Sequence, residues 1–364
     1  MARKVVDPKE LRAKTAEEKR LLELSQLREE KWNNEELLAL LKTKGIRVDV
    51  IDMDGTTPLS HAAYKGNGEA CNILLEHGAD VNWAQHGDKY TPLMFSMMSG
   101  SPSTTKLLLE AGADKDAFNN MHRNAFQVAV SLGQYGSIGV LKNFMPLKDV
   151  KRYCSGKGFP SLPTHLVKPV YQLVTTTDIH PVKLILELQT CKELLDTNEH
   201  FCAVLESLQR EHFLEDHYVL AFKLHYISYI VQYCTVDQDG DQILLKRLLQ
   251  AKEPSGTYPE VDGFLRQCVR EYEHTKECSV SINMIQTLST IPIGDERSTY
   301  SVFHEWIVAH KSDEDKECST CGRFGKELSR CSKCKKVYYC SPECQKLAWT
   351  VGNHKKLCKL WREP

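Results

Sequence analysis

Apolar residues recur at spacings of three and four along most of this chain, with polar residues between them. This is the period of a helix that buries one face, whereas a half-buried strand alternates at every second residue. The pattern predicts one charged helix near the amino end and six helices in the middle of the chain. These helices are expected at 8–30, 181–195, 199–213, 217–234, 242–251, 261–272 and 280–288. The fold class that follows is mainly α.

Two stretches near the amino end repeat one pattern. Residues 55–82 read GTTPLSHAAYKGNGEACNILLEHGADVN, and residues 90–114 read YTPLMFSMMSGSPSTTKLLLEAGAD. The shared positions lie 34 residues apart and include Thr57 and Thr91, Pro58 and Pro92, Gly66 and Gly100, Leu75 and Leu109, and Gly78 and Gly112. A Thr-Pro step favours the start of a helix, and a later glycine favours the end of one. Each unit therefore predicts two short helices, which need a neighbouring unit to bury their apolar faces.

The repeated pattern resembles the ankyrin repeat, whose period is about 33 residues and whose signature is T-P-L-H-x-A. The resemblance implies a solenoid, which we place at residues 33–146. A third, degenerate unit at 120–144 has Asn124-Ala125 in place of Thr-Pro, and the segment LLKTKGIRVD at 40–49 indicates an amino-terminal capping unit. Residues 1–32 are expected to form a charged helix and cap.

One segment of the repeat region matches an enzyme motif. Residues 50–56, VIDMDGT, fit the DxDGT loop of haloacid dehalogenase phosphatases, in which Asp52 would be the nucleophile and Asp54 the general acid. The same residues also form the turn that begins a repeat, D-x-x-G-x-T-P-L, and this turn already requires the glycine. The alternation of strands and helices that such a phosphatase needs does not follow the motif. We therefore predict that the chain is not an enzyme.

The carboxyl end carries eight side chains that can bind a metal, in four tight pairs. The pairs are Cys318 and Cys321, Cys331 and Cys334, Cys340 and Cys344, and His354 and Cys358. Zinc takes four such ligands in a tetrahedron, so the set predicts two structural Zn²⁺ ions with no position left for a reactive water. Free thiols and a disulfide framework are the alternatives. Free thiols are disfavoured because seven of the 14 cysteines lie in this short tail. A disulfide framework is disfavoured because residues 1–15 contain no apolar leader. The spacing alone permits sequential or interleaved pairing.

The tail resembles a MYND zinc finger over residues 318–358, and we place this domain at 312–364. The resemblance implies interleaved pairing, with Cys318, Cys321, Cys340 and Cys344 on the first ion and Cys331, Cys334, His354 and Cys358 on the second. Nine residues separate the sixth ligand from the histidine, where MYND fingers usually have seven.

The same resemblance implies a binding groove on the finger. In peptide-binding MYND fingers a serine, a glutamine and a tryptophan contact an extended, proline-containing peptide. Ser332, Gln345 and Trp349 stand at the matching positions. Tryptophan offers proline a flat apolar face, and glutamine can form hydrogen bonds with a peptide backbone. The alternative is that Trp349 only packs the small core of the finger.

The basic tail raises the alternative of nucleic-acid binding. Residues 318–364 hold 11 basic and 3 acidic residues, in a chain whose formal net charge is −1. Seven zinc-bound thiolates would remove part of this positive charge. The basic residues are scattered, with no recognition helix and no interleaved stacking aromatics. We therefore expect protein partners rather than nucleic acid.

Large side chains at positions expected to be exposed on the repeats predict a second surface, for a cytoplasmic segment of a membrane protein. They are Tyr64, Trp83, His86, Tyr90, Phe95, Met97 and Phe118. Aromatic and methionine side chains on a concave surface are typical of contact hot spots. Trp83 and Tyr90 are expected near the tips of the fingers that precede each repeat's first helix.

Residues 147–311 predict an irregular helical domain without assignable chemistry, joined to the repeats by a connection rich in proline and glycine at 146–169. The longest mostly apolar stretch, 219–234, falls short of the roughly 20 residues needed to cross a bilayer. We therefore expect no direct membrane insertion.

The order of ankyrin repeats, helical middle and MYND finger resembles the ankyrin repeat and MYND domain-containing protein 2 family. That resemblance implies a cytoplasmic adaptor that helps to deliver membrane signalling proteins, including guanylyl and adenylyl cyclases, to cilia. The alternative is a nuclear transcriptional corepressor scaffold whose finger binds proline-rich peptides. A lysine methyltransferase of the SET and MYND type is disfavoured, because Asn353-His354, the one Asn-His step in the sequence, belongs to the finger.

Overall fold

The chain forms two compact units, Met1–Phe144 and Met145–Pro364. A computed structural model describes residues 12–26, 32–155, 162–234, 243–250, 259–274, 277–293, 299–308, 316–325 and 328–361, and the statements below concern these residues. Within them, no helix has both the length and the apolar character required to cross a membrane.

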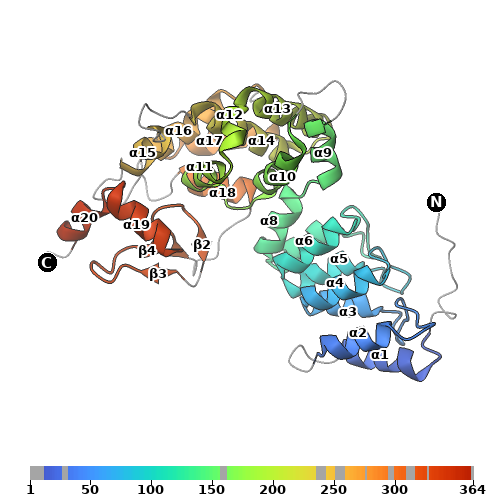
Figure 1. Cartoon of the computed structure of the whole chain (residues 1–364). Helices are drawn as coiled ribbons and strands as arrows, with labels where there is room; N and C mark the ends of the chain where they lie inside the picture. The colour runs from blue at the N-terminus through green and yellow to red at the C-terminus, as the bar shows by residue number, and fades with distance from the viewer. Residues whose placement is uncertain are drawn as a thin grey trace. The chain divides into compact units, whose positions relative to one another are not determined.

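The first unit is a row of helix pairs (Figure 1). The helices are α1 (Ala16–Gln26), α2 (Asn34–Leu41), α3 (Pro58–Tyr64), α4 (Gly68–Glu76), α5 (Pro92–Ser99), α6 (Pro102–Glu110), α7 (Ala125–Ser131) and α8 (Tyr135–Asn143). The first helix of each pair packs on the first helix of the next, α3 on α5 and α5 on α7, and the second helices do the same, α4 on α6 and α6 on α8. The predicted solenoid is confirmed, because this stacking buries the apolar face that each pair leaves open.

Side-chain hydrogen bonds cap the amino end of the first helix in each of three pairs. The Thr57 side chain accepts from the Ser60 N–H at the start of α3, and Thr91 accepts from Met94 at the start of α5. In the degenerate unit, Asn124 and Gln127 form a reciprocal capping box at α7. Asn124 is therefore the N-cap residue at the position where the other repeats have threonine.

Glycine closes the second helices. Gly78 after α4 and Gly112 after α6 have φ values of 89° and 92°, a conformation that glycine adopts without steric cost.

Helix α1 lies inside the predicted charged segment 8–30, of which 8–11 and 27–30 fall outside the described residues. Thr15 and Glu18 cap it reciprocally. The Glu18 carboxylate also receives two bonds from the Arg47 guanidinium, at 2.7 and 2.8 Å, and these hold the pKa of Glu18 at about 2. Leu21 and Leu24 are fully buried and α1 packs on α3, so this helix extends the solenoid core.

The second unit is a helical domain followed by a small finger of strands and helices. The helical elements are α9 (Leu147–Ser155), the 3₁₀ turn Thr164–Leu166, α10 (Val167–Thr175), α11 (Pro181–Thr190), α12 (Lys192–Asp196), α13 (Asn198–Leu214), α14 (Tyr218–Tyr233), α15 (Ile243–Gln250), α16 (Pro259–Arg270), α17 (Ser279–Ser289) and α18 (Thr299–Ile307). Helix α14 contacts α10, α11, α13, α17 and α18, and it buries most of its side chains among them.

The helices predicted at 199–213, 217–234, 242–251, 261–272 and 280–288 correspond to α13 to α17, although residues 242 and 251 fall outside the described ranges. The helix predicted at 181–195 divides into α11 and α12, because the backbone at Cys191 leaves the helical conformation (φ −129°, ψ 70°).

The prediction of a connection at 146–169 is wrong in part, because α9 and the start of α10 lie within it. Residues 156–161 of this segment fall outside the described ranges.

The finger packs against the helical domain. Gly322 adopts a φ of 65° and lies so close to the His180 ring that an added Cβ would stand 2.2 Å from it. The ring of Tyr300 on α18 meets the His180 ring edge-on, with centroids 4.6 Å apart. Burial lowers the pKa of His180 to about 3, so its imidazole is neutral. One continuous cluster of buried residues includes both the finger cysteines and α14. The predicted boundary at 311/312 falls among residues outside the described ranges.

Candidate metal centre and binding surfaces

Short hairpins and helices bring the metal-binding side chains together. Strands β1 (Lys316–Glu317) and β2 (Phe324–Gly325) pair antiparallel, as do β3 (Ser329–Arg330) and β4 (Tyr338–Tyr339). The first hairpin encloses Cys318 and Cys321, and the second encloses Cys331 and Cys334. Two helices supply the remaining ligands beyond Cys340, with Cys344 on α19 (Pro342–Thr350), and His354 and Cys358 on α20 (His354–Leu360). Ser341 caps α19 through the Cys344 N–H, and Pro342 takes its first position.

The first cluster consists of Cys318, Cys321, Cys340 and Cys344, whose sulfur atoms all lie within 4.8 Å of one another. The Cys340 Sγ is 3.5 Å from that of Cys321 and 3.6 Å from that of Cys344. Two thiolates on one tetrahedral zinc stand about 3.8 Å apart, so these separations fit a shared ion. The thiols of Cys321 and Cys344 direct hydrogen bonds at the Cys318 sulfur and lower its pKa, which favours the thiolate that binds metal.

The second cluster consists of Cys331, Cys334, His354 and Cys358, all of them buried. The His354 Nε2 lies 3.4 Å from the Cys331 Sγ and 3.9 Å from the Cys334 Sγ. A nitrogen and a sulfur on one tetrahedral zinc are separated by about 3.6 Å, so this set also fits one ion.

The predicted interleaved pairing is confirmed, because each cluster joins the first and third pairs or the second and fourth. Both donor sets suit zinc, which accepts thiolates and imidazole. Zinc would tie the hairpins to the helices at these positions. Four protein ligands leave no open coordination position, so both sites are structural.

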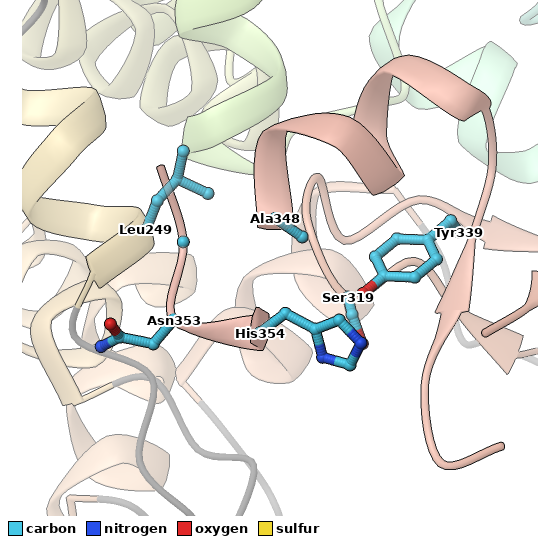
Figure 2. Close-up of a pocket in the computed structure, with 7 residues that line it drawn as sticks. Leu249, Ser319, Tyr339, Ala348, Asn353 and His354 are labelled. Atoms are coloured by element: carbon cyan, nitrogen blue, oxygen red, sulfur yellow. The ribbon is translucent and has the colours of Figure 1, made fainter. Parts of the chain in front are cut away.

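Contacts around the second cluster fix the histidine ring. The rings of Tyr339, Trp349 and Trp361 lie around His354, with centroids 5.8 to 5.9 Å from its own. Figure 2 shows His354 at a small pocket together with Tyr339, Ser319 and Ala348 of the finger, and with Leu249 of α15. This pocket therefore lies where the helical domain meets the finger, and the three residues predicted to contact peptide are not part of its lining.

The predicted peptide-contacting residues are accessible to different degrees. Ser332 and Gln345 are exposed, whereas Trp349 is half-buried and packs against the finger's core. The Lys333 ammonium lies 4.9 Å from the centre of the Trp349 ring. Trp349 therefore serves the core and still offers part of its surface to solvent.

Four of the aromatic side chains predicted on the repeats form one cluster, which we call the aromatic surface: Tyr64, His86, Tyr90 and Phe95. The Phe95 ring centroid lies 6.3 Å from Tyr64, 6.1 Å from His86 and 5.7 Å from Tyr90. Tyr64 is 52% exposed and the other three are half-buried. The rings come from α3, α5 and the loop between α4 and α5, so the surface spans two repeats.

The prediction that Trp83 and Met97 are exposed is wrong. Trp83 is only 4% exposed, and its indole N–H donates to the Gly55 carbonyl (3.0 Å), which joins two successive repeats. Met97 on α5 is fully buried. Phe118, by contrast, is exposed.

Two exposed methionines were not among the surface residues predicted from the sequence. Met53 is 81% exposed in the turn before α3, and Met121 is exposed in the turn before α7. The sequence could have predicted their exposure, because each lies in the turn that precedes the first helix of a repeat. A backbone bond from the Asn120 N–H to the Asp88 carbonyl links the turn that holds Met121 to the loop before α5.

Asp52, the nucleophile of the phosphatase alternative, is engaged in the repeat turn. Its Oδ1 accepts from the N–H groups of Asp54 and Thr56, and its Oδ2 lies 2.8 Å from the His61 Nε2. Burial alone would raise the pKa of Asp52, but the bonds from Thr56 and His61 outweigh it and lower the pKa. This arrangement stabilises the turn.

Family comparisons agree with these two modules. A MYND finger family matches residues 318–358, a family of ankyrin repeats in three copies matches 30–85, and a single ankyrin repeat matches 88–120. The chain carries ankyrin repeats and a MYND finger.

Whole-chain similarity extends to Dauer abnormal formation protein 25 of Caenorhabditis elegans. The two are 27% identical over 349 residues, covering 91% of this chain and 88% of the relative.

Two further relatives match short segments. Ubiquitin C-terminal hydrolase 15 of Oryza sativa subsp. japonica is 49% identical over 45 residues, which cover 12% of this chain and 4% of the hydrolase. A SET and MYND domain-containing protein of Dictyostelium discoideum is 58% identical over 36 residues, covering 10% of this chain and 6% of that protein. Because each match covers so small a part of the relative, the catalytic activity of neither protein is inferred for this chain.

Proposed function

We propose that this protein is a non-enzymatic adaptor in the delivery of membrane signalling proteins, including guanylyl and adenylyl cyclases, to cilia. Its ankyrin repeats and MYND finger are protein-interaction modules. In this proposal the repeats bind a cytoplasmic segment of the membrane protein, and the finger binds a proline-containing peptide. The family resemblance supports the cargo and destination, and the aromatic surface supports the mode of binding.

The aromatic surface is the observation that carries the proposal. Aromatic side chains bury a large area on binding and have few rotatable bonds, so ordering them costs little entropy. The His86 Nε2 lies 2.8 Å from the Tyr90 carbonyl oxygen, which further limits the movement of its ring. A partly exposed ring cluster of this kind is typical of a contact hot spot.

A size-matched pair of substitutions tests the aromatic surface. Tyr64→Ala removes an exposed ring from it, and Tyr135→Ala removes a similarly exposed ring from α8, outside it. The probe is the purified cytoplasmic domain of a membrane guanylyl cyclase, with affinity measured by calorimetry. We expect Tyr64→Ala to weaken binding at least tenfold, about 1.4 kcal/mol, and Tyr135→Ala to leave it unchanged. Equal affinities for both variants and the unaltered chain would contradict the proposal.

The finger surface is tested on α19 by neighbouring exposed residues. Gln345→Ala removes a predicted peptide contact, and Lys346→Ala is its control. We expect weaker binding of a proline-containing peptide for Gln345→Ala alone, with unchanged zinc content in both variants. Trp349→Ala is less decisive, because its ring also packs against the zinc ligand His354.

Localisation separates the adaptor from the nuclear alternative. In ciliated cells that lack the protein, we expect the cyclases to be depleted from cilia and restored by the unaltered chain but not by Tyr64→Ala. Normal ciliary cyclase together with a nuclear tagged chain would favour the corepressor scaffold.

A further inference from the structure

A third group of metal-binding side chains lies at the junction of α13 and α14: His212, Glu215 and His217. Their ligand atoms all fall within 4.8 Å of one another, as in the two clusters of the finger. These residues are far from the finger in sequence, and the adaptor function does not use them.

The backbone at the end of α13 brings these side chains together. The His217 N–H donates to the His212 carbonyl (2.8 Å), and the Asp216 N–H donates to the Phe213 carbonyl (3.2 Å). Asp216 has a φ of 60°. This is a Schellman motif, which places the side chain after the left-handed residue against the side chain five positions earlier. An apolar pair usually occupies these two positions, whereas this chain has two histidines there.

The separations of the three ligand atoms fit one tetrahedral ion. The two Nδ1 atoms are 3.4 Å apart, and the Glu215 Oε2 lies 3.7 Å from His212 Nδ1 and 3.4 Å from His217 Nδ1. Nitrogen and oxygen ligands about 2.1 Å from zinc are separated from one another by about 3.4 Å. Good hydrogen bonds between such atoms are shorter, about 2.7–3.2 Å. The triangle is therefore too wide for strong hydrogen bonds and has the size that a shared metal requires.

The surroundings also favour a cation. The group lies at the carboxyl end of a 17-residue helix, where the backbone carbonyls present partial negative charge. His212 is buried, which fixes one ligand, while Glu215 and His217 remain partly exposed, so an ion can enter from solvent.

We propose that His212, Glu215 and His217 form a third zinc site, in which both imidazoles bind through Nδ1 and the carboxylate through one oxygen. Two imidazoles and a carboxylate are a donor set that zinc accepts. The site clips the start of α14 to the end of α13. Its fourth coordination position is open to solvent, unlike those of the two finger sites.

Metal stoichiometry tests the proposal on the full chain, without a polyhistidine tag, equilibrated in buffered micromolar zinc. We expect three zinc ions per chain, falling to two in His217→Ala and in Glu215→Gln. The control is His165→Ala, which removes an exposed histidine whose ring lies 2.7 Å from Glu193 Oε2. It should keep all three ions. A weak chelator should remove the third ion first, because the thiolate sites of the finger bind zinc more tightly.

A second readout identifies the ligand atoms. Zinc addition to chain whose finger is already loaded should shift the Nδ1 resonances of two histidines in a nitrogen-detected imidazole spectrum. That response should be lost in His217→Ala and kept in His165→Ala. Two zinc ions in the unaltered chain under these conditions, or a third ion that both site variants retain, would overturn the proposal.

Discussion

At the scale of single residues, Lys223 places an amine inside the helical domain. Its side chain is fully buried on α14, where Nζ donates to the Thr176 carbonyl. Burial disfavours the ammonium form and lowers the pKa of Lys223 to about 7, from 10.5 for an exposed lysine. Between these two pH values the unfolded chain binds more protons here than the folded chain does.

Lys223 should therefore make the second unit less stable as pH falls from 10.5 to 7, since protons favour the unfolded state over that interval. We expect its contribution to the free energy of unfolding to drop by roughly 2 kcal/mol between pH 9 and pH 7. Lys223→Met should remove that part of the pH dependence. Urea unfolding of both proteins at the two pH values measures it, and identical pH dependences would show that the amine titrates normally.

Gly322 permits close contact between the finger and the helical domain. Gly322→Ala adds a Cβ 2.2 Å from the His180 ring, at a φ of 65° that disfavours alanine. We expect a loss of roughly 2–3 kcal/mol in stability, measured by denaturant unfolding. Gly263→Ala, in helix α16 with open space around the new Cβ, is the control and should be neutral or stabilising by about 0.5–1 kcal/mol. Equal effects of the two substitutions would argue against the close packing.

Exposure of single repeat residues was only partly predictable. The 34-residue offset identifies the helix or finger that a residue occupies, but a shift of one position decides which way its side chain faces. Trp83 and Met97 are buried for this reason, whereas Tyr64 remains on the surface.

At the scale of elements, helix α7 depends on the capping box of Asn124 and Gln127. Asn124→Ala should cost about 1 kcal/mol of stability, because it leaves helix-end N–H groups without their acceptor. Asn72→Ala, at an exposed position inside α4, is the control and should change stability little, because alanine favours helix interiors. Thermal unfolding followed by circular dichroism measures both. A loss no larger for Asn124→Ala than for Asn72→Ala would count against the cap.

Local signals explain which elements the sequence predicts. Thr-Pro steps, closing glycines and paired cysteines each act within a few residues, so the repeats and the finger follow from spacing. Helices α9 and α10 were missed because the prolines and glycines of the segment 146–169 indicated a connection. Most of these residues lie outside the two helices, and Pro169 lies in the first turn of α10, where a missing N–H costs little. The histidine pair at the end of α13 was also missed, because its approach depends on the left-handed backbone at Asp216.

At the scale of the whole molecule, the helical domain and the finger share one core, which residue spacing could not predict. His180 and Gly322, for example, lie 142 positions apart in the chain and meet only through tertiary packing.

Removal of the finger's zinc should therefore loosen the helices against which the finger packs. Structural zinc contributes roughly 10–16 kcal/mol in isolated fingers, so a strong chelator should unfold this one. We expect faster amide hydrogen exchange in α11 and α18, which carry or adjoin His180 and Tyr300, and unchanged exchange in α3 to α7. Unchanged exchange in α11 and α18 would show that the finger folds independently, and faster exchange throughout the repeats would contradict the division into two units.

An adaptor must hold two partners at once, and simultaneous binding is the most direct test of this account. Calorimetry would measure the affinity of the cyclase cytoplasmic domain for the full chain, first alone and then with the finger saturated by a proline-containing peptide. The aromatic surface and the finger belong to different units, so we predict equal affinities and a ternary complex of all three components. Loss of cyclase binding in the presence of the peptide, with the two partners mutually exclusive, would contradict the adaptor function.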